Sequence, residues 1–194
     1  MKKLIFLLLA QFALIVVVNG QSFDSIKNRA ESGDSLAQFN LALMYYTGKS
    51  IKPDTVKAFY WYQKSAEHGY AKAQAILASM YYIGMGTSKD LNKALYWLKK
   101  SAEQGDEKAQ VMLSFMYYSG QGTPKDLSKA FYWYKKSAEQ GYFRAQYNLA
   151  LMYYYGPGGI PTNKKLSAYW MKKAYNDGYQ KAKETWNKLE LWKY

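Results

Sequence analysis

A motif of about 36 residues returns along this chain, and this repetition constrains the fold more than any other feature of the sequence. Glycines mark the period at Gly33, Gly69, Gly105, Gly141 and Gly178, with intervals of 36, 36, 36 and 37 residues. An Ala-Gln pair and then a Tyr-Tyr pair follow each of the first four glycines in the same register. Periods of roughly 20 to 50 residues indicate stacked units, none of which buries its apolar face alone. The sequence therefore predicts an array of such units, an architecture typical of binding surfaces.

Each repeat has the pattern of two helices joined by a loop. In the first repeat, Ala37, Leu41 and Met44 share one helical face, which predicts a helix A over residues 35–46. A second apolar face predicts a helix B over residues 55–68. An aspartate stands at the N-cap position of helix B in three repeats, as Asp54, Asp90 and Asp126. All prolines of the chain lie between a helix A and a helix B, where helix breakers belong.

The repeated words resemble one family. The pattern Ala-Gln-x-x-Leu-Ala-x-Met-Tyr-Tyr-x-Gly, followed by Asp-x-x-Lys-Ala-x-Tyr-Trp and Lys-Ser-Ala-Glu-x-Gly, is similar to the Sel-one-like repeat, a branch of the tetratricopeptide-like arrays. The resemblance implies an all-α fold, an α/α solenoid of helix pairs with a right-handed superhelix. It covers residues 34–178 as four units, 34–69, 70–105, 106–141 and 142–178. Some exported relatives carry a disulfide in each unit, whereas this chain has no cysteine.

The ends of the chain lie outside these four units. Residues 21–33 and 179–194 each predict a helix that caps the exposed core of the array. Residues 1–20 have the layout of a secretory signal peptide, with Lys2 and Lys3 before an apolar run from Leu4 to Val18 and small residues at Asn19 and Gly20. Cleavage there would export a soluble chain to the periplasm or the medium. The alternative is a retained anchor, although 15 residues are fewer than the roughly 20 that cross a bilayer.

The net charge and the absence of cysteine limit the kinds of partner and site that we expect. The formal net charge is +13, which favours anionic partners through long-range attraction. Export makes an acidic protein or peptide, an acidic envelope polymer or an anionic lipid surface the expected partner, and nucleic acid is not expected. A basic face that only aids solubility is the alternative. Without cysteine, the chain has no disulfide, thiolate metal site or cysteine nucleophile.

The sequence indicates no catalytic, metal or cofactor site. His68 is the one histidine, and it stands at the end of helix B where other repeats have Gln104 and Gln140, which favours a structural role. The acidic residues recur singly at helix ends, and no phosphate-binding glycine loop is present. We therefore predict a protein that is not an enzyme and that needs no cofactor. Activity on the cell wall or on β-lactams, linked to some members of the resembled family, has no support in these residues.

Two sets of aromatic residues need an interpretation. Tyr-Trp pairs on helix B are predicted to pack in the core and between repeats rather than to bind sugars: Tyr60, Trp61, Tyr96, Trp97, Tyr132 and Trp133. On helix A, the resemblance and the helical spacing point to a concave groove. Its predicted peptide-binding residues are Phe39, Leu43, Tyr46, Tyr82, Val111, Phe115, Tyr118, Tyr147, Leu151 and Tyr154, with a basic edge at Lys72, Lys108 and Arg144. The alternative is that Tyr46, Tyr82, Tyr118 and Tyr154 pack between neighbouring repeats.

Three functions follow from these patterns. The first is an exported, non-enzymatic adaptor or scaffold that binds a protein or peptide through the helix-A groove. The alternative is a binder of an anionic envelope polymer or lipid surface through helix-B lysines, namely Lys99, Lys100, Lys135, Lys136, Lys172 and Lys173. The third is the wall enzyme mentioned above. The sequence names neither the partner nor the oligomeric state.

Overall fold

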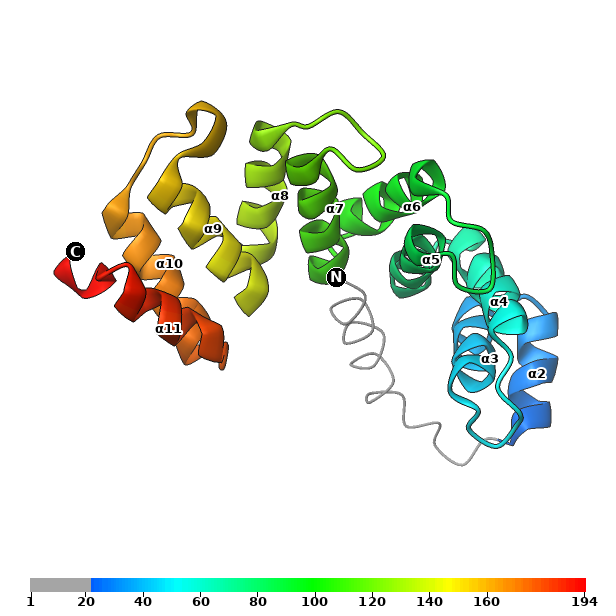
Figure 1. Ribbon diagram of the computed structural model, residues 1–194. Helices are drawn as coiled ribbons and strands as arrows, with labels where there is room; N and C mark the ends of the chain where they lie inside the picture. The colour runs from blue at the N-terminus through cyan, green and yellow to red at the C-terminus, as the bar shows by residue number, and fades with distance from the viewer. Residues whose placement is uncertain (1–21) are drawn as a thin grey trace. The chain divides into compact units, whose positions relative to one another are not determined.

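The computed structural model describes residues 22–194, which form ten α-helices and two short 3-10 helices (Figure 1). The predicted signal peptide, residues 1–20, lies outside the described residues. The all-α class is confirmed, because the described helices pack in sequence as antiparallel pairs. No described helix combines the length and the apolar character needed to cross a membrane.

The described chain divides into two compact units, residues 22–104 and 105–194. The described helices of the first unit are α2 (Phe23–Glu31), α3 (Ser35–Thr47), α4 (Thr55–Glu67), α5 (Ala71–Ile83) and α6 (Leu91–Glu103). Within this unit α3 packs on α4 and α5 on α6, while α2 covers α3. The predicted N-terminal cap is therefore a helix that packs on the first repeat.

The second unit continues the same alternation. Its helices are α7 (Glu107–Ser119), α8 (Leu127–Glu139), α9 (Phe143–Tyr155), α10 (Lys164–Asn176) and α11 (Gln180–Lys188), with 3-10 turns η1 (Pro157–Gly159) and η2 (Leu191–Lys193). Here α7 packs on α8, α9 on α10, and α11 on α10. Helices A are thus α3, α5, α7 and α9, and helices B are α4, α6, α8 and α10.

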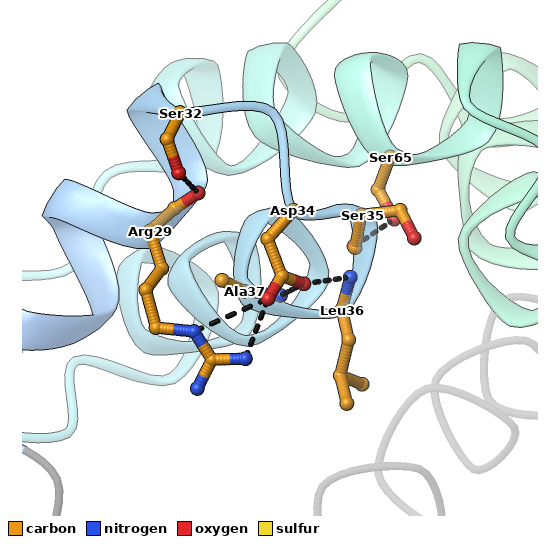
Figure 2. Close-up of polar contacts among 7 residues, drawn as sticks. All are labelled: Arg29, Ser32, Asp34, Ser35, Leu36, Ala37 and Ser65. Atoms are coloured by element: carbon orange, nitrogen blue, oxygen red, sulfur yellow. Dashed lines mark hydrogen bonds and ion pairs between the residues drawn. The ribbon is translucent and has the colours of Figure 1, made fainter.

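Side-chain caps fix where the helices begin. The Asp54 carboxylate accepts from the backbone N–H groups of Val56 and Lys57, and Asp90, Asp126 and Asn163 hold the same place before α6, α8 and α10. In front of α3, Asp34 accepts from Leu36 N and Ala37 N and also pairs with Arg29 (Figure 2). These bonds, above all that from Ala37 N, hold the pKa of Asp34 below its ordinary value.

Serine hydroxyls tie the helices B α4, α6 and α8 to the start of their helices A. Ser65 Oγ donates to the backbone oxygen of Ser35 at 2.7 Å (Figure 2). Ser101 and Ser137 repeat this bond one period later each, to Ala71 O at 2.9 Å and Glu107 O at 2.8 Å. The three serines are 0% exposed, so each bond satisfies a hydroxyl that water cannot reach.

Alanines let the paired helices approach. Ala42 in α3 and Ala58 in α4 are both 0% exposed, as are Ala78 and Ala94 in the next pair. Larger side chains fill the space beside them, and Ile26 of α2 joins Leu41 and Met44 in one buried cluster. The alanines that recur at these positions of the repeat therefore have a packing role.

The C-terminal region differs from the single helix predicted over residues 179–194. Helix α11 ends at Lys188, and Glu190 takes a left-handed conformation with φ 51° before η2. This reversal returns Leu191 to the core, where it is 0% exposed among Ala150, Met171 and Ala182. Burial of Leu191 offsets the backbone strain that a residue other than glycine incurs there.

Candidate functional site

The structure distributes the predicted groove residues between interior and surface. Phe39, Leu43, Tyr82 and Tyr147 are buried, at 1%, 7%, 8% and 8% exposure. Tyr46, Val111, Phe115, Leu151 and Tyr154 are half-buried, and Tyr118 is exposed at 43%. Residues at equivalent positions of the repeat thus differ in their exposure to solvent.

The prediction that all of these side chains face a groove is wrong for Phe39 and Tyr147. The Phe39 ring packs edge-on against Tyr62 and Tyr70, with centroids 5.5 and 5.0 Å away. The Tyr147 hydroxyl lies 3.2 Å from Thr185 Oγ1, and its ring packs against Tyr179. Aromatic side chains that arrive from the following helices cover both positions, an effect that the repeat register alone does not reveal.

Three predicted residues do come together around an open cavity in the unit of residues 105–194. Phe115 and Tyr118 project from α7, and Leu151 projects from α9. The cavity measures about 370 Å³, and its remaining lining residues are Tyr134, Asn148, Met152, Tyr155 and Pro157. Its size and its apolar, aromatic walls suit one bulky side chain of a partner.

Polar groups at this cavity are few. Tyr134 on α8 is 5% exposed, and burial raises the pKa of its hydroxyl, which stays protonated at neutral pH. The lining also contains the Asn148 amide and the hydroxyl-bearing side chains of Tyr118 and Tyr155. Lys125 Nζ lies 5.8 Å from the centroid of the Tyr118 ring and adds positive charge at the rim.

The predicted basic edge varies in exposure. Lys72 is exposed, while Lys108 and Arg144 are half-buried. Arg144 stands four residues before Asn148 on α9, so the two side chains share one helical face about 6 Å apart along the axis. Within the described residues, Nε and Nη1 of Arg144 are buried without a hydrogen-bond partner. A guanidinium with two unsatisfied donors favours an anionic ligand group.

The interpretation of the helix-B tyrosines as core residues is wrong. Tyr60, Tyr96 and Tyr132 are 51%, 52% and 51% exposed, and a lysine one turn later lies over each ring: Lys64 at 5.8 Å, Lys100 at 5.2 Å and Lys136 at 5.8 Å. The adjacent tryptophans Trp61, Trp97 and Trp133 are half-buried and take the packing role. Neighbours in a helix are about 100° apart, so the pair cannot both face inward.

The glutamine of each Ala-Gln pair has a structural role that the sequence analysis missed. Gln38 is 3% exposed, its Nε2 donates to Ala30 O, and its Oε1 accepts from His68 Nδ1 at 2.9 Å. In the next repeats Gln104 and Gln140 replace the histidine and donate to Gln74 and Gln110, each at 2.8 Å. His68 therefore takes the place of a glutamine as the donor. The constant 30-residue spacing of these pairs could have predicted the contact from the sequence.

A second cavity, of about 380 Å³, lies beside the long loop of the fourth repeat. Phe131, Tyr153 and Ser128 line it together with the loop residues Gly158, Gly159, Ile160, Pro161, Thr162 and Asn163. Gly158 has φ 65°, and a β-carbon there would meet Leu127 Cδ1 at 2.4 Å. Glycine therefore allows this loop to lie against α8. Among residues 22–194, no three acidic or histidine side chains gather in a way that could hold a metal ion.

Comparison with protein families gives four consecutive matches to one model. The model described as the Sel1 repeat matches residues 35–70, 71–106, 107–142 and 143–179. These matches cover well over half of the chain. The Sel1 repeat is the family that the repeated words resemble.

Solved structures have the same fold. A Sel1 repeat protein from Oxalobacter formigenes is 35% identical with a TM-score of 0.79, and the match covers 84% of this chain and 67% of that one. A protective antigen of uropathogenic Escherichia coli strains, which displays an SLR fold, is 33% identical with a TM-score of 0.79 over 82% of this chain. The present chain spans 34% of that antigen.

A curated relative matches over a shorter stretch. A sel1-like repeat-containing protein of Acanthamoeba polyphaga mimivirus is 48% identical over 42 residues, which are 22% of this chain and 7% of the relative. The chain thus spans a small part of this relative and about a third of the Escherichia coli antigen.

Proposed function

The chain belongs to the Sel1 repeat family, and from that premise we propose that it is an exported scaffold that binds an acidic peptide segment through α7 and α9. Proteins of this fold commonly mediate protein interactions, which makes binding the expected class of function. The single observation that carries the proposal is the cavity of Phe115, Tyr118, Tyr134 and Leu151. It is open and rich in apolar and aromatic side chains, and most of its residues come from the helices A α7 and α9, as a peptide groove requires.

The cavity and the nearby Arg144 together indicate the chemistry of the ligand. A cavity of about 370 Å³ accepts an aromatic or large aliphatic side chain. Arg144 is half-buried one helical turn before Asn148 and carries a positive charge there, which favours a carboxylate in the ligand. The Asn148 amide between them can pair with a peptide backbone. The ligand is therefore a segment in which an acidic residue accompanies an apolar anchor.

The proposed function involves no catalysis. His68, the one histidine, donates to Gln38 and so holds a structural place. Tyr134 remains protonated at neutral pH because its pKa is raised, so it provides a hydrogen bond and no general base.

Peptide selection against the chain tests the proposal. We expect a random peptide library to yield segments that combine an apolar anchor with acidic residues, and fluorescence anisotropy then gives their Kd. Tyr118→Ala and Phe115→Ala should each weaken binding by roughly tenfold or more, because buried aromatic anchors carry most interface energy. Arg144→Gln should remove the preference for acidic over amidated peptides.

Tyr132→Ala is the matched control. Tyr132 is an exposed tyrosine of α8 that does not line the cavity, so its loss should leave the Kd unchanged. Circular dichroism of each variant checks that the helices persist. Full affinity in both Tyr118→Ala and Phe115→Ala would show that the groove assignment is wrong.

Export is the second part of the proposal. It rests on the sequence of residues 1–20 alone. Expression with the native N-terminus in a bacterial host, followed by fractionation and N-terminal sequencing, should give a periplasmic or secreted chain that begins at Gln21. An unprocessed chain in the membrane fraction would favour the retained anchor.

A further inference from the structure

Helix α10 carries an outward stripe unlike those of the other helices B. Lys165, Tyr169, Lys172 and Asn176 recur every three to four residues and therefore share one face, and all four are exposed. Leu166 and Lys173 flank this stripe, with Leu166 37% exposed. Tyr169 is 55% exposed, and Lys173 lies over the neighbouring Trp170 ring instead of over Tyr169.

The other helices B neutralise part of their lysine charge at both ends. Their N-cap aspartates pair with the lysine three residues later: Asp54 with Lys57 at 3.6 Å, Asp90 with Lys93 at 3.8 Å and Asp126 with Lys129 at 2.9 Å. Their last helical residue is a glutamate: Glu67, Glu103 and Glu139. In α10 the corresponding residues are Asn163, Leu166 and Asn176, and the helix contains no acidic residue.

The segment that follows α10 extends this basic surface. Lys181, Lys183 and Lys188 project from α11 and are exposed. The acidic groups nearby are Asp177, which accepts from Gln146 Nε2 at 2.9 Å, Glu190, which pairs with Lys193, and the exposed Glu184 of α11. Lysines outnumber these carboxylates on α10 and α11. Because α11 packs on α10 (Figure 1), the lysines of both helices belong to one end of the unit of residues 105–194.

Exposed aromatic residues accompany these lysines. Trp192 is 63% exposed, Tyr194 57% and Tyr175 39%. The fold presents Trp192 outward, because its neighbour Leu191 is 0% exposed and fixes η2 to the core. We call the basic end the surface formed by Lys165, Tyr169, Lys172, Lys173, Lys181, Lys183, Trp192 and Tyr194.

We propose that the basic end docks on an anionic lipid bilayer surface. Lysines near such a surface are attracted by its negative potential. Tryptophan and tyrosine prefer the boundary between headgroups and acyl chains, because their rings are apolar and their N–H or O–H groups remain hydrated. This surface combines both signals, and two weak signals together are what stable peripheral attachment requires.

A bilayer explains the basic end better than a soluble polyanion does. A polyanion would pair with the lysines and leave Leu166, Trp192 and Tyr194 in water. Insertion of these side chains into the interface removes their apolar surface from water while the lysines remain at the headgroups. The proposal is independent of the peptide site, whose residues lie on α7, α8 and α9 and in the turn that follows α9.

Vesicle co-sedimentation tests the proposal on the full chain and on a chain that begins at Gln21 and retains every described helix. We expect binding to phosphatidylcholine vesicles that contain phosphatidylglycerol, and little binding to phosphatidylcholine alone. The double variant Lys172→Glu with Lys173→Glu should lower the partition coefficient by at least about tenfold. The matched double variant Lys135→Glu with Lys136→Glu places the same charges on α8 and should have a clearly smaller effect.

The aromatic contribution is tested separately. Trp192→Ala changes no charge and affects an exposed side chain, so the fold should persist, yet binding should fall by roughly threefold to tenfold and become fully salt-sensitive. Native chain should keep part of its binding at high salt. Depth-dependent quenching by brominated lipids, compared between native chain and Trp192→Ala, then reports insertion of this ring.

Three results would overturn the proposal. The first is an absence of binding to the anionic vesicles by the chain that begins at Gln21. The second is an equal loss of binding in the α8 and α10 double variants. The third is binding to soluble polyglutamate with the same dependence on Lys172, Lys173 and salt but no effect of Trp192→Ala, which would identify an acidic polymer as the ligand.

Discussion

The third repeat, α7–α8, and the fourth, α9–α10, bury side chains at corresponding positions but differ in the charge of their exposed residues. Tyr134 of α8 and Met171 of α10 occupy corresponding positions, and both are buried. On the surface, Asp126 and Glu139 of α8 correspond to Asn163 and Asn176 of α10. The interior positions stay buried because their side chains fill the space between helices, although the residue type changes from Tyr134 to Met171. Asp126 and Asn163 both cap their helices, so the change from a carboxylate to an amide keeps the cap while it removes a charge.

One interior bond also separates the two repeats. Ser137 of α8 donates to Glu107 O, whereas Ala174 stands at the corresponding place in α10 and is 0% exposed. The fourth repeat compensates with packing, because α11 and Leu191 cover α10 and join Met171 in one cluster. Packing of the C-terminal cap on α10 therefore takes the place of this hydrogen bond in the fourth repeat.

Truncation of the shared interior should have the largest effect. Met171→Ala should lower the free energy of unfolding by about 2–5 kcal/mol, because it leaves a cavity between α10, α11 and Leu191. Tyr134→Phe in the third repeat removes only a hydroxyl and should cost less than about 1 kcal/mol. Urea unfolding followed by circular dichroism measures both. A Met171→Ala loss as small as that of Tyr134→Phe would show that the cap does not close this core.

Exchange of the serine bond should have an intermediate effect. Ser137→Ala should cost about 1 kcal/mol, because the Glu107 carbonyl loses its donor in a buried place. Ala174→Ser should have the opposite sign, with a gain of up to about 1 kcal/mol if the new hydroxyl reaches Phe143 O. The same unfolding measurement compares them. If Ala174→Ser destabilises the chain as much as Ser137→Ala does, the fourth pair is packed too tightly for the bond.

The caps should have the smallest effect and should depend on pH. The bond from Lys129 N, together with the Lys129 ammonium, holds the pKa of Asp126 below its ordinary value of 3.8. A carboxyl whose pKa falls on folding adds stability above its unfolded pKa and loses it as the pH falls through the folded pKa. Asp126→Asn should therefore be slightly destabilising at neutral pH, and the difference should vanish below the folded pKa.

In the fourth repeat the reverse substitution replaces the capping asparagine by an aspartate. Asn163→Asp should add a small pH-dependent stabilisation to α10 at neutral pH, since Lys164 and Lys165 follow it. It should also weaken the proposed binding to anionic vesicles. Thermal unfolding at neutral pH and near pH 3 checks both variants. A pH-independent difference for Asp126→Asn would mean that the cap acts only as a neutral acceptor.

Much of the fold could be predicted from local chemistry. The helices of the first repeat, predicted over 35–46 and 55–68, are Ser35–Thr47 and Thr55–Glu67. The predicted caps Asp54, Asp90 and Asp126 all accept from the first turn of their helices. These features depend on residues a few positions apart, and each repeat supports the same prediction independently. The handedness of the superhelix and the cleavage of residues 1–20 stay predictions.

The candidate site could be predicted only in part. Phe115, Tyr118 and Leu151 were found because they lie in register on helix A, and they do line one cavity. Tyr134 and Tyr155 complete it from positions outside the predicted set. Phe39 was misplaced because Tyr62 and Tyr70 cover it from more than twenty residues away. The helix-B tyrosines were misplaced because the periodicity did not decide which member of each Tyr-Trp pair faces inward.

The sequence by itself determined the family, the helix pairs and their caps, because these depend on residues within one repeat and on the period itself. Only the tertiary structure decided which side chains of the repeat are accessible. Exposure is a property of what packs on a residue, and those neighbours come from other helices, as with Tyr62 against Phe39 and Thr185 beside Tyr147. The repeat therefore specifies the scaffold, while contacts between helices select the surfaces available for binding.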